Sequence, residues 1–146
     1  SEMCIRDSFW INPGSMIEVD TRKVVDVVDI TASVEASLGE RRVTSGICLV
    51  YTLHTTTGII VNEADGPLIQ DILALLERLV PKGGGYLHDR SDGNAHAHLR
   101  ASLLGSSAVI PVEQGRLALG TWQRILLFEL DGPRRRRVHV MAVPGE

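Results

Sequence analysis

The histidines are the residues of this sequence whose number and placement most clearly suit metal binding or catalysis. Four of the five histidines fall between positions 54 and 98, at expected strand ends or in loops, where functional sites are commonly built: His54, His88, His96 and His98. Neutral imidazole is the commonest metal ligand, and three imidazoles with an open position make a catalytic zinc site. The spacing matches no short zinc signature such as HExxH, so ordinary hydrogen-bonding histidines remain the alternative.

Two of these histidines are separated by a single residue in a segment that is expected to be helical. Residues two apart do not share a helix face, so at most one of His96 and His98 would point toward a common metal. In an extended segment both would lie on one face. The helical prediction therefore favours one ligand from this segment.

A glutamate is expected at a buried position in the strand predicted at 121–130. Counting by twos places Gln123, Ile125, Leu127 and Glu129 on one face of that strand. A buried carboxylate requires a partner. Either an arginine of the following strand or a substrate group could supply it.

Arginine forms a run at 134–137, after the turn signal Asp131-Gly132-Pro133. In a strand these side chains alternate between faces, so the run is not one continuous basic patch. Paired edge charges are one interpretation, and anion binding through the forked guanidinium is the other. The glycines at 83–85 lack the lysine and the hydroxyl residue of a phosphate loop, so they indicate a flexible connection.

The elements that must position these residues follow from periodicity and from breakers. Helices are expected at 31–38, 67–80 and about 95–104, and strands at 16–21, 23–30, 45–54, 58–62, 107–112, 116–119, 121–130 and 134–143. There is no regular alternation of strands and helices, which predicts an α+β fold with a largely antiparallel β-sheet core and two to three helices. Residues 1–15 have no such pattern, and we expect them to be a disordered or non-native leader before a single domain at 16–146.

Composition limits the classes of function. A chain of 146 residues with 44% hydrophobic residues fits one domain, and a net charge of −3 argues against general nucleic-acid binding. No apolar stretch approaches the length of a membrane span or a secretory signal, so we expect a cytoplasmic protein without membrane contact. Two cysteines do not make a disulfide framework, and Cys48 lies in an apolar run where a buried thiol is expected.

Six short motifs occur in an order that resembles the YjbQ-like family: HTTTGIIVNEADGP, YLHD, NAHAH, LLGSS, GTWQ and FELDGPRRRR. The resemblance covers about residues 16–146. It implies an α+β fold, a homotrimer, and the activity of a secondary thiamine-phosphate synthase. One departure is Gly66, which stands where relatives often have Asp, so the neighbouring Asp65 is expected only to cap a helix.

The resemblance also implies a site. It implies metal ligands at His54, His88 and His98, with zinc as the expected ion. The remaining residues are catalytic Glu63 and Gln123, with substrate contacts from Thr55, Thr56, Asn62, Arg100, Trp122 and Arg134. The implied enzyme, a transferase, joins hydroxymethylpyrimidine diphosphate to thiazole phosphate and releases pyrophosphate.

Two alternatives to that activity stay open at this point. The first is a different metal-dependent hydrolase or transferase acting on a small phosphorylated metabolite. The second is a non-catalytic trimer that uses the histidines to hold a metal or an anion. The threonines after His54 either donate hydrogen bonds to a bound anion or are strand formers at a bend.

Overall fold

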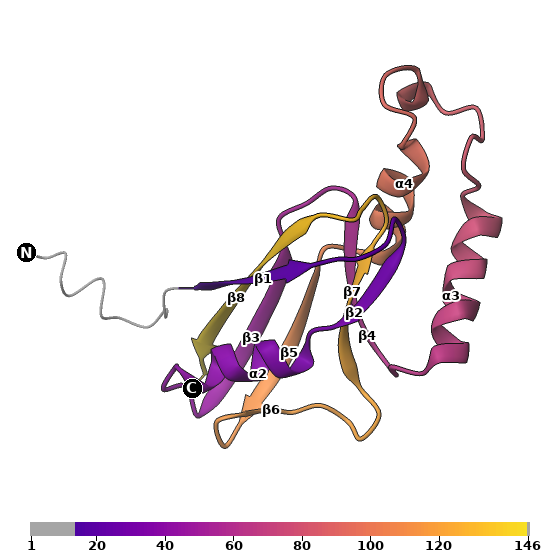
Figure 1. Cartoon of the computed structure of the whole chain (residues 1–146). Helices are drawn as coiled ribbons and strands as arrows, with labels where there is room; N and C mark the ends of the chain where they lie inside the picture. Colours follow the sequence, from indigo (N-terminus) through magenta and orange to yellow (C-terminus); the bar gives the residue numbers. More distant parts are fainter. Residues whose placement is uncertain (1–13, 146) are drawn as a thin grey trace, which may run out of the picture.

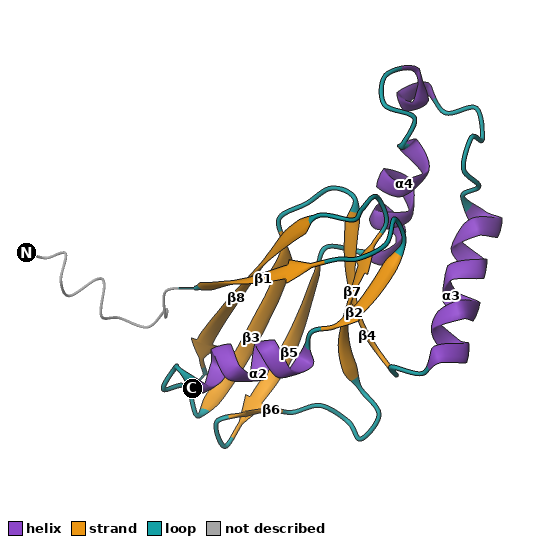
Figure 2. Ribbon diagram, in the orientation of Figure 1, coloured by secondary structure: helices purple, strands orange, loops and turns teal. Residues whose placement is uncertain are grey.

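Two antiparallel sheets form the framework of the protein, which we describe from a computed structural model covering residues 14–145 (Figure 1). The large sheet has the strand order β1-β8-β3-β5-β6, and the small sheet has the order β2-β7-β4. The strands are β1 (Ser15–Asp20), β2 (Asp26–Asp29), β3 (Ser45–Thr52), β4 (Thr57–Asn62), β5 (Ser107–Glu113), β6 (Arg116–Leu117), β7 (Arg124–Glu129) and β8 (Arg135–Pro144). With the three helices of the described chain, this confirms the predicted α+β fold (Figure 2).

One face of the large sheet builds the main core. Alternate residues of β8 point inward, so that Val138, Val140 and Ala142 are fully buried. Helix α2 (Thr31–Gly39) lies across this face and contributes Val34 and Leu38 to the same cluster. Within residues 14–145, no helix lies on the opposite face (Figure 1).

Strand β7 is buried on both of its faces because the main core covers one face and helix α4 covers the other. Ile125 and Leu127 join the core under the large sheet, whereas Leu126 and Phe128 pack in a second cluster with Ala97 of helix α4. The two faces are those that counting by twos predicts. A strand covered on both sides shows a continuous apolar run, as this one does.

Helix α4 (Ala95–Leu104) contacts β4, and a glycine sets the closeness of that contact. A Cβ added to Gly58 would lie 2.6 Å from the Cβ of Leu104, closer than two carbon atoms can approach. Because glycine has no side chain, α4 can pack closely against β4 at this position. This contact brings the start of α4 to the same end of the molecule as the turn before β4.

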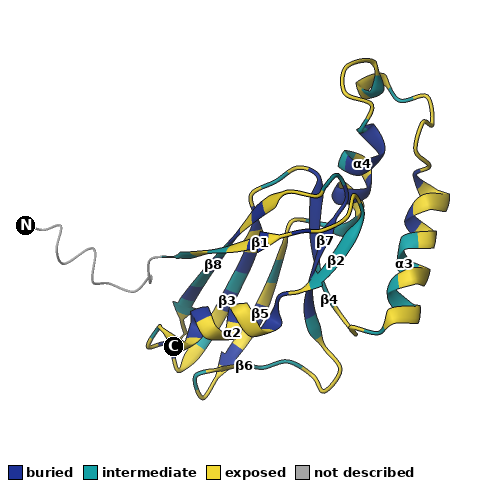
Figure 3. Cartoon of the chain, in the orientation of Figure 1, coloured by how far each residue is buried: buried dark blue, intermediate teal, exposed yellow. Residues whose placement is uncertain are grey.

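Helix α3 (Gly66–Leu79) begins at a cap that the sequence predicts. Asp65 accepts a hydrogen bond from the backbone N–H of Leu68 at 3.0 Å, and Pro67 occupies the first turn. The helix stands beside the body with much of its surface exposed (Figure 3), and Leu76 is its one fully buried residue. At its far end the buried Arg100 side chain donates to the carbonyl of Val80 at 2.9 Å, which ties α3 to α4.

Some boundaries differ from the sequence prediction. The second strand begins at Asp26, not at 23, and the predicted strand at 116–119 shortens to two residues. Trp122 and Gln123 precede β7 in a turn closed by the Gln123 N–H and the Gly120 carbonyl at 3.1 Å. The expected leader lies outside the described residues up to position 13, and Ser15 belongs to β1. No helix in the part of the chain described here is long and apolar enough to cross a membrane.

Candidate functional site: a polar pocket between three segments

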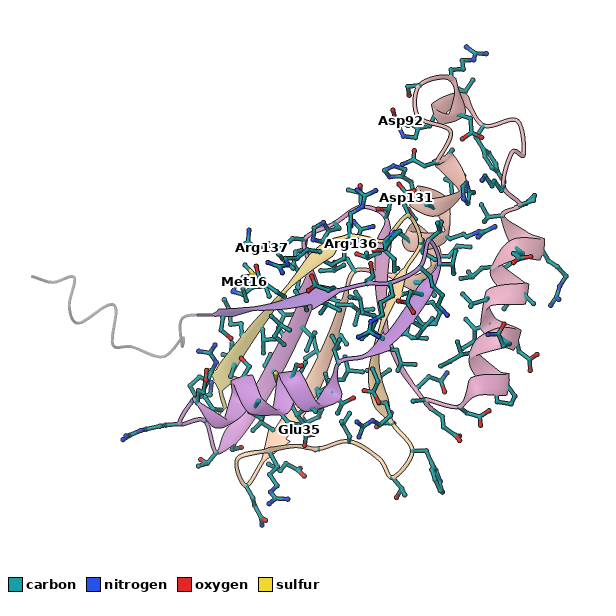
Figure 4. The ribbon with its side chains drawn as sticks, viewed as in Figure 1. Met16, Glu35, Asp92, Asp131, Arg136 and Arg137 are labelled. Atoms are coloured by element: carbon teal, nitrogen blue, oxygen red, sulfur yellow. The ribbon has the colours of Figure 1, made fainter. Side chains whose placement is uncertain are left out.

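A polar pocket of about 370 Å³ lies where three segments meet at one end of the small sheet. The connection between β3 and β4 forms one wall, the loop and start of α4 form the second, and the turn between β7 and β8 forms the third. Asp92, Asp131 and Arg136 mark the second and third walls in Figure 4. The lining residues are Leu53, His54, Thr55, Thr56, Asp92, Asn94, His98, Asp131, Arg134 and Arg136.

His54 is held in one protonation state by a backbone contact. The N–H of Arg137 donates to His54 Nε2 at 2.8 Å, so this nitrogen carries a lone pair and the ring hydrogen is on Nδ1. Burial, followed by the positive charge of Arg136, lowers the pKa of His54 below its usual value. The side chain is therefore a neutral imidazole with a single donor.

A buried ion pair supports the threonine wall. Arg136 and Glu129 are almost completely buried, and the guanidinium donates to both carboxylate oxygens, through Nε at 2.7 Å and through Nη2. Nη2 of Arg136 also donates to the Thr56 hydroxyl at 2.9 Å. The partner predicted for a buried Glu129 is thus an arginine of the following strand, and this arginine fixes a pocket residue as well.

The ion pair keeps Glu129 charged in spite of its burial. Burial alone would raise the pKa of this carboxyl group. Hydrogen bonds from Arg136, from the Asp131 N–H at 3.0 Å and from the Thr21 hydroxyl at 2.7 Å outweigh that effect and lower the pKa below its usual value. The pocket floor is therefore a fixed network of satisfied polar groups.

Arg134 lies at the mouth of the pocket with half of its side chain exposed. Its Nη2 donates to the Asp131 carbonyl at 2.7 Å and lies 3.5 Å from the Asp131 carboxylate. Asn94 donates to the same carboxylate oxygen at 2.9 Å. Asp131 thus links the turn before β8 to the start of α4.

His98 is shared between this pocket and a neighbouring, mainly apolar pocket of about 600 Å³. His88 lines the second pocket, and its ring meets that of His98 edge-on, with 4.7 Å between the ring centres. His96 points elsewhere: it is buried, and its Nδ1 has no hydrogen-bond partner among the described residues. The two side chains thus have different surroundings, as expected for residues two apart on a helix.

The predicted zinc site is wrong. Over residues 14–145, no three histidine, cysteine, aspartate or glutamate side chains are placed to hold one metal ion. His54 and His88 line different pockets, and the lone pair of His54 Nε2 already accepts the Arg137 N–H. Its Nδ1 would have to lose a proton before it could bind a metal.

Several of the expected site residues lie away from the pocket. Asn62 ends β4, roughly 17 Å along the strand from Thr57 given the rise per residue of a strand, and Glu63 follows it. Trp122 and Gln123 precede β7 and lie at that same far end, because Asn62 pairs with Arg124. Within one chain, none of these four residues lines the pocket, nor does Arg100, which is buried against Val80.

Three acidic or amide residues of the pocket were missed as ligand contacts. Asp92 and Asn94 come from the polar loop before α4, and Asp131 comes from the turn before β8. In the sequence these residues resemble turn and helix-cap residues, because Asp and Asn are common in those positions. A pocket residue can be told from an ordinary turn or cap residue only when the structure shows that the two turns lie together.

The fold and the site together define the class of this protein: a small α+β domain with a polar pocket at one end of its second sheet. The family model described as "UPF0047 protein YjbQ-like" matches residues 15–145, and the chain belongs to this family. A UPF0047 protein of Archaeoglobus fulgidus is 55% identical over 127 residues, which cover 87% of this chain and 98% of that protein. The UPF0047 protein YugU of Bacillus subtilis is 42% identical over 125 residues, covering 85% and 94%.

Solved structures agree with the fold. A YbjQ-like protein of unknown function from Sulfolobus solfataricus superposes with a TM-score of 0.88 at 38% identity, covering 91% of this chain and 97% of that one. A hypothetical protein from Aeropyrum pernix has a TM-score of 0.88 at 42% identity, covering 92% and 100%. These relatives carry family names or are described as being of unknown function. The predicted metal-dependent thiamine-phosphate synthase is therefore corrected: the family is shown, and that activity is not.

Proposed function

We propose that the pocket binds a small phosphorylated metabolite directly, through hydrogen-bond donors of the protein. The observation that carries this proposal is the fixed state of His54, whose one ring hydrogen is on Nδ1. A neutral donor in a pocket wall suits an anionic oxygen and needs no metal ion. Thr55 and Thr56 add hydroxyl groups to the same wall.

Arg134 supplies the positive charge that a phosphate group requires. The guanidinium has five donors, and Nη2 is the one engaged, with the Asp131 carbonyl. Nε and Nη1 have no hydrogen-bond partner among residues 14–145. The planar fork of arginine fits two oxygens of one phosphate, which a lysine does not.

Titration calorimetry with ethyl phosphate tests the proposal, because this probe carries a phosphate ester and no other polar group. We expect Arg134→Ala and His54→Ala each to weaken binding about tenfold or more, the usual cost of losing a hydrogen bond to a charged group. Arg135→Ala is the matched control, since Arg135 is exposed, pairs with Asp20 at 2.9 Å and does not line the pocket. Absence of binding to the unaltered protein, or equal losses in all three variants, would contradict the proposal.

We also propose that the protein self-associates as a homotrimer through the uncovered face of the large sheet. The strand registers place Ile47 beside Pro111 and Val143, and Leu49 beside Val109 and Met141. The next row contains Tyr51, beside His139. Ile47, Tyr51 and Val109 are 43%, 42% and 56% exposed, although they form one contiguous apolar surface. Monomeric proteins rarely leave such a surface in water.

Light scattering after size-exclusion chromatography tests this second proposal. Val109→Asp should reduce the mass of the assembly, because a charge on the apolar face would be buried without a partner. Val24→Asp is the control, since Val24 is similarly exposed, at 58%, but lies outside the sheets. A monomeric unaltered protein would refute the homotrimer.

We place the protein in the cytoplasm as a further proposal. Cys48 is a buried free thiol in the main core, and burial raises its pKa to about 11. An unpaired structural cysteine fits a reducing compartment. Cell fractionation checks the location, and recovery from an oxidising compartment would contradict it.

A further inference from the structure

The pocket lining carries two chemically different sets of groups. In one set, His54 and Thr55 offer hydrogen-bond donors, and Arg134 offers a positive charge. In the other set, Asp92 and Asp131 offer carboxylates, and that of Asp131 lies 3.5 Å from Arg134. A pocket built only for a phosphate group would have no use for the second set.

The net charge of the pocket lining shows why the carboxylates matter for ligand binding. Arg136 is neutralised by Glu129, so it adds no net positive charge to the pocket. Arg134 then faces two carboxylates, Asp92 and Asp131, so the aspartates and arginines of the lining leave one net negative charge. For a phosphate dianion alone, the two carboxylates offset part of the attraction of Arg134 and so weaken its binding.

Resting on the phosphate binding proposed above, we propose that the ligand is a zwitterion, a phosphate monoester that also carries a primary ammonium group. The phosphate lies against His54 and Arg134, and the ammonium group lies against Asp92 and Asp131. A volume of about 370 Å³ is within the size range of small-metabolite sites. The ammonium group restores the charge balance that the phosphate would otherwise upset.

The two carboxylates retain the capacity to accept these hydrogen bonds. In Asp131, Oδ2 accepts from Asn94, whereas Oδ1 accepts no hydrogen bond from any described residue. In Asp92, the nearest charged or ionisable partner is His88, at 3.9 Å and beyond hydrogen-bond distance. Both carboxylates are partly exposed, with side-chain exposures of 66% for Asp92 and 29% for Asp131, so a ligand can reach them.

Calorimetric titration with 2-aminoethyl phosphate and with ethyl phosphate tests the proposal. The two probes have the same heavy-atom chain apart from the amine, so the ratio of their affinities isolates the ammonium contribution. We expect 2-aminoethyl phosphate to bind about tenfold more tightly to the unaltered protein, the gain of one hydrogen bond between charged groups. Asp92→Asn should bring the ratio close to one while the affinity for ethyl phosphate stays the same or rises.

Asp71→Asn is the matched control, because it makes the same change of charge at an exposed position on α3 away from the pocket. The ratio should be unchanged in this variant. Equal binding of both probes to the unaltered protein, or an unchanged ratio in Asp92→Asn, would overturn the ammonium assignment and leave phosphate binding in place. Failure of both probes to bind would overturn the proposed function and this inference with it.

Discussion

The two ends of the small sheet carry similar polar residues, but these residues differ in burial and in hydrogen bonding. At the pocket end, Thr57 pairs with Glu129, and the polar groups are buried and bonded to one another. At the opposite end, Asn62 pairs with Arg124, and the polar groups are exposed. The same three strands therefore support a pocket with buried, bonded polar groups at one end and form an ordinary exposed surface at the other.

Local hydrogen bonds satisfy two polar groups at the exposed end, where Arg124 also donates to Asp29, far away in the chain, at 2.7 Å. Asn62 accepts the N–H of Glu63 at 2.8 Å, and Gln123 accepts the N–H of Gly120 at 2.8 Å. At the pocket end, the bonds join residues far apart in the chain, such as Thr21 and Glu129. The convergence of several donors on the buried carboxylate of Glu129 thus distinguishes the candidate site from a polar strand end.

The largest expected effect comes from removing one member of the buried ion pair. Arg136→Met should lower the free energy of unfolding by about 3–5 kcal/mol, because it leaves the charge of Glu129 buried without its partner. Urea denaturation measures the change. Arg135→Met removes only exposed pairs with Asp20 and Glu18, which water and salt screen, so it should cost far less. Equal losses in both variants would remove the distinction between buried and exposed arginines.

Acid should destabilise the pocket end through two groups. The pKa values of His54 and Glu129 are both lowered on folding, so the unfolded chain binds protons more readily. The stabilising effect of His54 is present above the usual histidine pKa of 6.5 and is lost as pH falls through its lowered pKa. The effect of Glu129 is present above the usual glutamate pKa of 4.5 and is lost as pH falls through its own lowered pKa. Thermal melts across this range should show a shallower first decrease in His54→Ala. Parallel curves for variant and unaltered protein would contradict the role of His54.

An intermediate effect is expected at the cap of α3, which follows the exposed end of the small sheet. Asp65→Ala should cost about 1 kcal/mol in the free energy of unfolding, because the Leu68 N–H loses its acceptor. Asp65→Asn, which keeps an acceptor oxygen, should cost less. Phosphate affinity should be unchanged in both variants, and a large loss of affinity would show that the two ends are coupled.

The smallest effects are expected from the exposed end itself. Glu63→Ala and Trp122→Ala should each change the free energy of unfolding by about 0.5 kcal/mol or less, since both side chains are exposed and Trp122 is 70% exposed. Neither should alter the affinity for ethyl phosphate in a monomeric preparation. A marked loss of affinity would place these residues in the site after all, contrary to their position within one chain.

Much of the fold follows from local patterns. The helix at 95–104 matches the prediction, the cap at Asp65 is confirmed, and counting by twos places Glu129 in the buried interior beside an arginine. These features depend on a few neighbouring residues and on periodicity. Helix α3 was also predicted from its apolar stripe, but the stripe alone does not show that most of the helix stays exposed.

The site was harder to predict because it depends on which ends of the elements meet. His54 and Glu63 are nine positions apart and both border β4, yet the strand separates them lengthwise. His54 and Asp131 are far apart in sequence but line one pocket. The state of His54 depends on the Arg137 backbone in another strand, which no local motif contains.

Gly58 has a consequence for how this family could diversify. Any side chain there would press against Leu104 and move α4 away from β4, carrying His98 away from His54. The distance between two walls of the pocket would then change without replacement of a residue that touches the ligand. Selection for ligands of different size could therefore act through a position of β4 that does not line the pocket.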